Sequence, residues 1–133
     1  MNIKIDTALL DSLTEQAKAS PRLRMNYDLR NSVIDSSQRM LNAIEPGSEV
    51  PVHRHQNTSE TMVVIRGCLV VEFYNDECAC EDTYEVSPSG PIVALNIPAE
   101  QWHSLRALES GTVILEIKDG VYKPIQQCDL LRP

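Results

Sequence analysis

The chain has 133 residues, a length that fits one domain of ordinary size. Its net charge of −7 argues against a nucleic-acid-binding protein, which would carry a basic face, and against an anionic membrane surface as partner. No apolar run approaches the ~20 residues of a membrane-spanning helix. Acidic residues also interrupt the N-terminal stretch where a signal peptide would be apolar, so the sequence predicts a cytoplasmic protein.

One helix is expected near the start of the chain, over residues 6–19. Asp6 can cap it, apolar residues recur at helical spacing from Ala8 to Ala17, and Pro21 ends the pattern. After Pro21 the apolar period changes to two, which indicates strands. The predicted strands are residues 38–44, 61–65, 69–74, 84–86, 92–97, 102–108 and 112–117. Short strands at this spacing favour an all-β sandwich or barrel.

All three histidines fall in positions that suit one metal site. His53 and His55 are two residues apart, so on a strand both imidazoles lie on the same face. Glu60 follows a short polar turn and begins the next strand, from which its carboxylate can return to the two rings. His103 stands at the start of a later strand. This mixed nitrogen and oxygen set suits one divalent transition metal such as Zn, Ni, Mn or Fe rather than Ca or Mg.

The spacing around the histidines resembles a known pattern. The stretch Gly47-x5-His53-x-His55-x4-Glu60-x6-Gly67 matches the first motif of the cupin superfamily at every fixed position. In cupins, this motif supplies the first part of a metal site. An octahedral ion held by four side chains keeps two positions open, and substrate, water or oxygen can occupy them.

A second cupin motif is present in a looser form. Pro98 and His103 hold their relative places, and Gly90 precedes them with a slightly longer spacer. Glu100 stands where the motif usually has glycine, and Ala107 where it usually has asparagine. The resemblance implies a double-stranded β-helix, a small jelly-roll barrel with the metal in its mouth. Together with the helix, the expected fold is an all-β cupin barrel with a short N-terminal α-helix.

A narrower resemblance covers most of the chain. It is similar to the WbuC-type cupin-fold metalloproteins, which are small bacterial proteins often associated with O-antigen or other surface-polysaccharide biosynthesis. The segments that carry the resemblance are the opening helix, residues 20–26, 38–40, the histidine motif, 98–103 and 115–122. Cupins of this size commonly pair, so the resemblance also implies a homodimer. The expected organisation is a single cupin domain over residues 1–133, with the helix in 1–20, the barrel in 21–125 and a C-terminal tail in 126–133.

Four arginines gather in the segment after the helix, although the chain as a whole is acidic. A guanidinium group binds phosphate or carboxylate in bidentate fashion, so the cluster is consistent with a pocket for an anion. Surface arginines paired with acids are the alternative, and both interpretations stay open for Arg22 and Arg30. Arg24, Asn26 and Arg39 lie in segments of the WbuC-type resemblance and are the preferred substrate-binding candidates.

The last predicted strand has two different faces. Glu116 and Lys118 share one face, and Leu115 and Ile117 share the other. If the apolar pair packs against the protein, the charged pair faces solvent or the mouth of the barrel. The resemblance favours Lys118 and Tyr122 at the rim of a pocket, where either could bind substrate or move a proton.

These features are consistent with three functions. The first is a metal-dependent enzyme, isomerase-like or epimerase-like, acting on a small oxygen-rich anionic substrate such as a sugar or sugar nucleotide. The second is an iron-dependent dioxygenase, because imidazole and carboxylate ligands with open positions support oxygen chemistry. The third is a non-catalytic module that binds a metal or a sugar, or acts as a sensor. The residues do not decide among them, and no catalytic residue is assigned beyond the candidates Lys118 and Tyr122.

Overall fold

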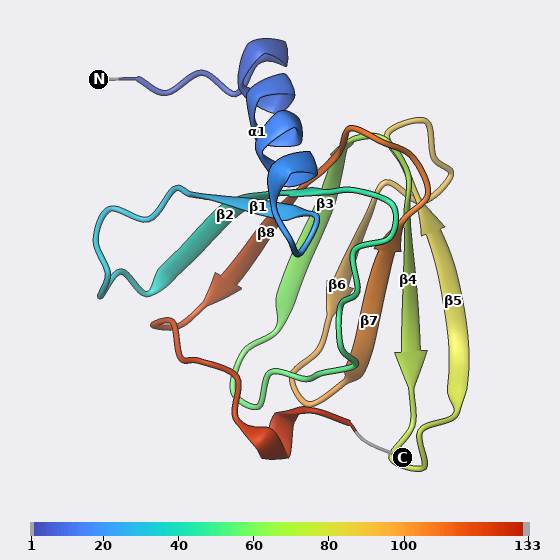
Figure 1. Ribbon diagram of the computed structural model, residues 1–133. Helices are drawn as coiled ribbons and strands as arrows, with labels where there is room; N and C mark the ends of the chain where they lie inside the picture. Colours follow the sequence, from blue (N-terminus) through green and yellow to red (C-terminus); the bar gives the residue numbers. More distant parts are fainter. Residues whose placement is uncertain (1, 132–133) are drawn as a thin grey trace.

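Two antiparallel sheets and one helix make up the fold (Figure 1). This computed structural model describes residues 2–131. Its elements are α1 (Thr7–Ala19), β1 (Arg24–Asp28), β2 (Ser37–Ile44), β3 (Glu60–Arg66), β4 (Leu69–Tyr74), β5 (Cys80–Val86), β6 (Ala94–Ile97), β7 (Trp102–Ala107), β8 (Thr112–Asp119) and a short 3-10 helix, Gln127–Asp129. The larger sheet has the strand order β1-β2-β8-β3-β6, and the smaller has the order β5-β4-β7. The predicted jelly roll with an N-terminal helix is confirmed.

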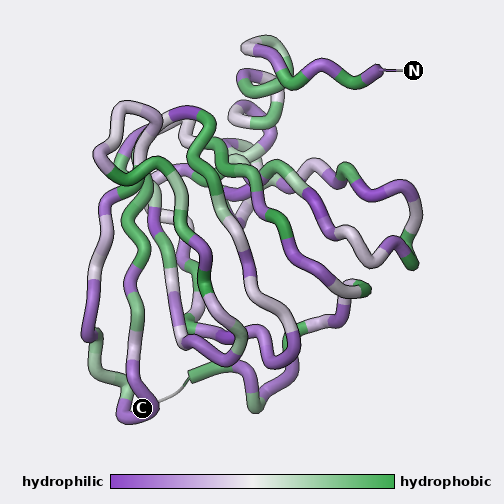
Figure 2. The backbone as a smooth tube through the Cα atoms, turned by 180° about the vertical axis from the view of Figure 1, so that it is seen from behind, coloured by the Kyte–Doolittle hydropathy of each residue, from purple (hydrophilic) through white to green (hydrophobic). Residues whose placement is uncertain are grey.

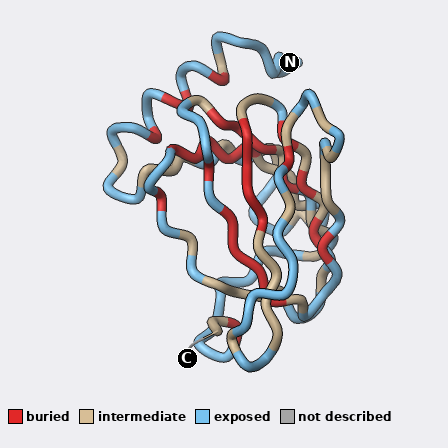
Figure 3. Tube along the Cα trace, turned by 90° about the vertical axis from the view of Figure 1, so that its right-hand side faces the viewer, coloured by how far each residue is buried: buried red, intermediate tan, exposed pale blue. Residues whose placement is uncertain are grey.

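The helix covers the outer face of the larger sheet. Asp6 caps it, because its Oδ1 accepts a hydrogen bond from the backbone N–H of Leu9 at 3.0 Å. Leu10, Leu13 and Ala17 are buried and pack in one cluster with residues of β2 and β8. Figure 3 shows this division, with buried segments on the side of the helix that meets the sheet. No helix in the described part of the chain is long and apolar enough to cross a membrane.

The main core lies between the two sheets. Alternate residues of each strand face inward, as Met62 and Val64 of β3 do, and meet Leu69 and Val71 of β4. Figure 2 shows hydrophobic stretches within the strands and mostly hydrophilic chain in the loops at the end opposite the helix. That hydrophilic end carries the histidine segment and the C-terminal segment.

Two parts of the strand pattern were not predicted from the sequence. β1 was absent from the prediction because its polar residues outnumber its apolar ones, yet Met25 and Tyr27 alternate with them and pack beneath the helix. β5 starts at Cys80 rather than at Tyr84, because its first residues are polar and exposed on a sheet edge. In both cases an edge strand needs only one packed face, so its apolar signal is weak.

Glu100 has a backbone conformation that suits the glycine usually found at its position in the second motif. Its φ is 69°, in the left-handed region that favours glycine, which is the residue this motif usually has there. Its backbone N–H donates to the carbonyl oxygen of His55 at 2.7 Å, a bond that glycine can also make. We expect Glu100→Gly to raise the free energy of unfolding by about 0.5–1 kcal/mol, because relief of strain exceeds the greater flexibility of the unfolded chain.

Urea unfolding of the metal-free protein measures this effect, with Glu81→Gly as the matched control. Glu81 is exposed on β5 and is not among the residues with positive φ. Its replacement is expected to lower the free energy of unfolding by about 0.5–1 kcal/mol. If both variants lower the free energy of unfolding by the same amount, the assignment of strain to Glu100 is wrong.

Candidate metal centre

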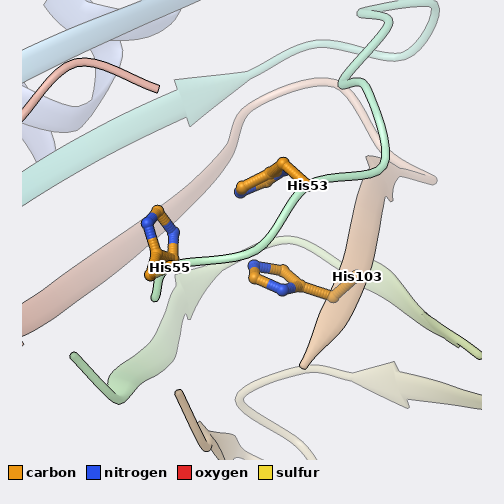
Figure 4. A group of neighbouring side chains, drawn as sticks. All are labelled: His53, His55 and His103. Atoms are coloured by element: carbon orange, nitrogen blue, oxygen red, sulfur yellow. The ribbon is translucent and has the colours of Figure 1, made fainter. Parts of the chain in front are cut away.

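Three imidazole rings converge at the hydrophilic end of the barrel. His53 and His55 lie on the segment before β3, and His103 lies on β7 (Figure 4). The backbones of His53 and His103 pair through two hydrogen bonds, at 2.9 and 2.8 Å. The ring centroid of His53 is 4.4 Å from that of His103 and 5.1 Å from that of His55. One ring nitrogen from each histidine lies within 4.8 Å of the other two, a spacing at which three ligands can share one metal ion.

Glu60, the first residue of β3, places a carboxylate beside these rings. Its Oε2 is 3.3 Å from Nε2 of His55 and 3.6 Å from Nε2 of His103. The Glu60 side chain is almost fully buried. Within the described residues, Glu60 Oε2 and His103 Nε2 are buried without a hydrogen-bond partner. Buried polar atoms normally have partners, so an orphaned carboxylate oxygen beside an orphaned nitrogen of the histidine triad fits a transition-metal ion bound between them.

Two backbone carbonyls orient the rings. Nδ1 of His53 lies 2.9 Å from the carbonyl oxygen of Pro51, and Nδ1 of His103 lies 2.9 Å from that of Gln101. A proton on each Nδ1 satisfies these carbonyls and leaves the lone pair of Nε2 available as a ligand. The sequence does not predict this support, because nothing in the residue types at 51 and 101 indicates which carbonyls the rings will meet.

The ionisation of the site also suits a metal. Burial, together with the neighbouring His103, lowers the pKa of His53 to about 4, so this imidazole is neutral at pH 7 and free to coordinate. Burial acts to raise the pKa of Glu60, but His103, His55 and Lys118 outweigh it and hold that pKa well below its ordinary value. Glu60 is therefore a carboxylate at neutral pH. Burial and the charge of Glu60 raise the pKa of Glu116 to about 8.

The C-terminal segment holds the histidine segment in place. Leu130 pairs with His53, and the carbonyl oxygen of Asp129 accepts from the backbone N–H of Arg54 at 3.1 Å. The Asp129 carboxylate accepts from Gln56 Nε2 at 2.7 Å, and Arg54 Nε lies 3.5 Å from it. These contacts fix the residues on both sides of His55. The expected tail over 126–133 is thus packed against the candidate site where it is described, although residues 132 and 133 lie outside the described part.

Two hollows meet at Lys118, and the first of them reaches the histidines at His55. The first hollow, about 410 Å³, lies between residues 54–58 and residues 118–126 and includes His55 in its lining. The second hollow, about 240 Å³, lies over the inner face of β1, β2 and β8. The two hollows share three lining residues, Gln38, Lys118 and Tyr122. The two hollows therefore lie side by side at these three side chains.

The substrate-binding candidates from the sequence are distributed unevenly around these hollows. Lys118 and Tyr122 line both, and Asn26 and Arg39 line the second. Arg24 lies on β1 but outside the lining of both hollows, and burial, together with Arg22, lowers its pKa. The second hollow also includes Glu116, which shares an inward face with Lys118 as the alternation of β8 predicts.

One known protein family matches the sequence of this chain. A family model described as a domain of unknown function, DUF6016, matches residues 5–86, more than half of the chain. The chain belongs to the DUF6016 family. The match spans the helix, the first motif and the strands up to the end of β5. No curated protein matches the DUF6016 chain in sequence.

Solved structures share the fold of this DUF6016 chain. The capsular polysaccharide assembling protein CapF of Staphylococcus aureus superposes with a TM-score of 0.67 and 21% identity over 79% of the chain. A cupin 2 domain-containing protein of Halorhodospira halophila has a TM-score of 0.61 and 17% identity over 77% of the chain, covering 68% of its own length. A proposed sugar phosphate isomerase of Acidithiobacillus ferrooxidans has a TM-score of 0.57 and 25% identity over 72% of the chain, covering 58% of its own length.

These likenesses confirm the cupin fold expected from the first motif. The DUF6016 chain spans only 28% of the length of the CapF chain, so the match concerns one part of that protein. The narrower resemblance to WbuC-type metalloproteins stays a prediction. So do the domain boundaries and the homodimer.

Proposed function

We propose that this protein binds one divalent transition metal through His53, His55, Glu60 and His103, and acts as an enzyme on a small anionic sugar or sugar nucleotide. The observation that carries the proposal is the convergence of three imidazoles and a buried carboxylate, with orphaned atoms, beside a hollow of about 410 Å³. Its volume suits a small oxygen-rich molecule.

A metal bound by these four side chains would supply a Lewis acid that polarises a carbonyl or hydroxyl oxygen of the substrate. Within this proposal Glu60 is a ligand, so it is not available as a free base. Lys118 lies beside Glu60, its residue partner across β3 and β8, and no ion pair in the described chain involves it. Its ammonium group can therefore bind the anionic part of the substrate or move a proton. Tyr122, which is half exposed, is the second candidate for proton transfer.

The comparisons support a sugar as the substrate class. One structural neighbour is a capsular polysaccharide assembling protein and another is a proposed sugar phosphate isomerase. The resemblance to WbuC-type proteins points to surface-polysaccharide biosynthesis, and the acidic chain with no nucleic-acid-binding signature is consistent with a small-molecule substrate. We extend the proposal to a homodimer acting in the cytoplasm.

The metal content of the purified protein tests the site. Protein purified without chelator or added metal is expected to contain about one equivalent of a transition metal by elemental analysis. The double variant His53→Ala/His55→Ala is expected to lose it, and circular dichroism checks that this variant is folded. If neither protein binds Zn, Ni, Mn or Fe after each ion is added, the proposal is wrong.

The identity of the metal separates the remaining alternatives. Zn, Mn or Ni supports Lewis-acid chemistry on a sugar. Iron together with oxygen consumption by the iron-loaded protein would favour a dioxygenase instead. Tight binding of a sugar without turnover would favour a non-catalytic binding module.

A further inference from the structure

The inner face of the larger sheet continues past the metal centre to the sheet edge. In Figure 1, β1 and β2 lie away from the smaller sheet, which packs over the other side of the barrel. Asn26 of β1 faces the same side as Asn42 of β2, and Gln38 of β2 pairs with Lys118 of β8. The second hollow lies on this uncovered polar face, and β1 ends the sheet there.

The arginines of the second hollow are already bound to protein partners. Arg30 grips the Asp28 carboxylate, with Nε at 3.0 Å and Nη2 at 2.8 Å from its oxygens. Arg39 donates to the carbonyl oxygens of Ser37 at 2.8 Å and Leu29 at 2.9 Å. Both guanidinium groups therefore serve as parts of the wall. An anion in the second hollow would have to compete with these partners.

Lys118 differs from both arginines. It stands in the wall shared by the two hollows, and it takes part in no ion pair within the described residues. Its Cα partner across the strands is Glu60, so the strand register places Lys118 next to the candidate metal centre. The position for a substrate anion is thus at the junction of the two hollows.

The rest of the second hollow suits hydroxyl groups. No described residue hydrogen-bonds the Asn26 side-chain amide, which offers both a donor and an acceptor. Gln38 donates through Nε2 to Gly120 at 2.7 Å, which leaves its side-chain oxygen to accept. Tyr122 adds an aromatic face, with the Arg30 guanidinium 5.7 Å from its centroid. Paired donors and acceptors beside an aromatic ring are the contacts that a sugar ring uses.

We propose that the second hollow binds the neutral, hydroxyl-rich ring of an anionic sugar whose phosphate or carboxylate group lies at Lys118. This inference rests on the proposed function and deepens it, because it divides the substrate between two places. The uncharged ring contacts Asn26, Gln38 and Tyr122. The anionic group contacts Lys118 beside the metal centre.

A variant that fills the second hollow tests whether the sugar ring binds there. Asn26→Phe places a bulky side chain at the hollow from an exposed edge strand, where an aromatic residue is well tolerated. Thr83→Phe is the matched control, on the exposed edge strand β5 of the other sheet. Asn26→Ala removes the amide without filling the space, so it keeps the test valid if Asn26→Phe does not fold. Metal content is measured in every variant.

Isothermal titration calorimetry of the metal-loaded proteins uses three probes: inorganic phosphate, a panel of hexose phosphates, and a panel of hexuronates. The wild type is expected to bind at least one sugar probe about tenfold more tightly than inorganic phosphate. Asn26→Phe is expected to remove this preference for the sugar and to leave the Kd of phosphate within about twofold of the wild-type value. Asn26→Ala is expected to reduce the preference. Thr83→Phe is expected to change neither. Whether hexose phosphates or hexuronates bind identifies the anionic group.

The outcomes separate this inference from the proposed function. If the wild type binds sugar probes more tightly than phosphate and both Asn26 variants keep that preference, the ring lies elsewhere and the inference is wrong. If phosphate and sugars bind equally, the anion site stands and the second hollow is not a sugar subsite. If the metal-loaded wild type binds none of the probes, the proposed function itself fails and the inference falls with it.

Discussion

Gly67→Ala is expected to lower the free energy of unfolding by about 3–5 kcal/mol. Gly67 has φ of 88° in the turn between β3 and β4, where the chain passes from the larger sheet to the smaller. A Cβ at this position would lie 2.6 Å from Cα of Thr112, which is fully buried at the start of β8. Backbone cannot rotate away as a side chain can, so β8 would have to shift.

Gly111→Ala is the matched control for this effect. Gly111 has a similar φ of 86°, but a Cβ there would meet only the guanidinium of Arg66, at 3.6 Å. The control therefore measures only the cost of placing alanine in the left-handed conformation, which is expected to lower the free energy of unfolding by about 1 kcal/mol. Urea unfolding of the two variants gives the difference, which belongs to the contact with Thr112. Equal losses would show that the backbone contact at Gly67 is relieved without a free-energy cost.

The contrast between these two glycines illustrates what the sequence can show. Gly67 is a fixed position of the first motif, and the motif predicted a cupin barrel without any knowledge of Thr112. Short spacings such as that from His53 to Glu60 are informative because they describe one short segment of the chain. The structure brings His53, His55 and His103 together although His103 is far along the chain, as the positions of the three histidines and the motif resemblance both predicted.

Other features of the site depend on contacts that no local pattern records. Asp129 belonged to an expected tail, yet its carboxylate holds Gln56 and Arg54 beside His55. The arginine cluster was a correct observation about composition, but Arg30 and Arg39 use their guanidinium groups within the β1–β2 hairpin. Whether a charged side chain is free to bind a ligand depends on its partners in three dimensions.

The edge strand β1 also could not be predicted from a local sequence pattern. Its two apolar residues, Met25 and Tyr27, are too few to outweigh the polar ones in a periodicity analysis. They pack because the helix lies over them, and that packing is tertiary. Two of the polar residues that obscured the strand, Asn26 and Asp28, line the second hollow.

Glu60→Gln is expected to lower the affinity for the metal by more than about 100-fold, and the metal-free protein is expected to lose some stability at neutral pH. The replacement keeps the size of the side chain and removes its charge. In the metal-free state burial penalises the ionised form of Glu60, but His103, His55 and Lys118 outweigh this penalty, so the carboxylate is the favoured form. A loss of stability is therefore expected for any well-held buried carboxylate, and the loss of metal affinity is the result that identifies a ligand.

Glu45→Gln is the matched control, since Glu45 is also a buried glutamate of the barrel. Its carboxylate accepts from the backbone N–H of Gly111 at 2.8 Å and from the hydroxyl of Ser110. An amide can satisfy only one of these donors with its oxygen, so this variant is expected to lose about 1–3 kcal/mol of stability. Its metal affinity is expected to stay unchanged, because Glu45 takes no part in the histidine group.

Competition with a chromogenic chelator measures the metal affinity, and urea unfolding of chelator-treated protein measures the stability. A Glu60→Gln protein that keeps wild-type affinity would show that the carboxylate is not a ligand. One that loses only stability, as Glu45→Gln does, would place Glu60 among the structural carboxylates. The predicted difference, with metal affinity lost at position 60 and kept at position 45, follows only if the carboxylate beside the three imidazoles is held for a metal ion.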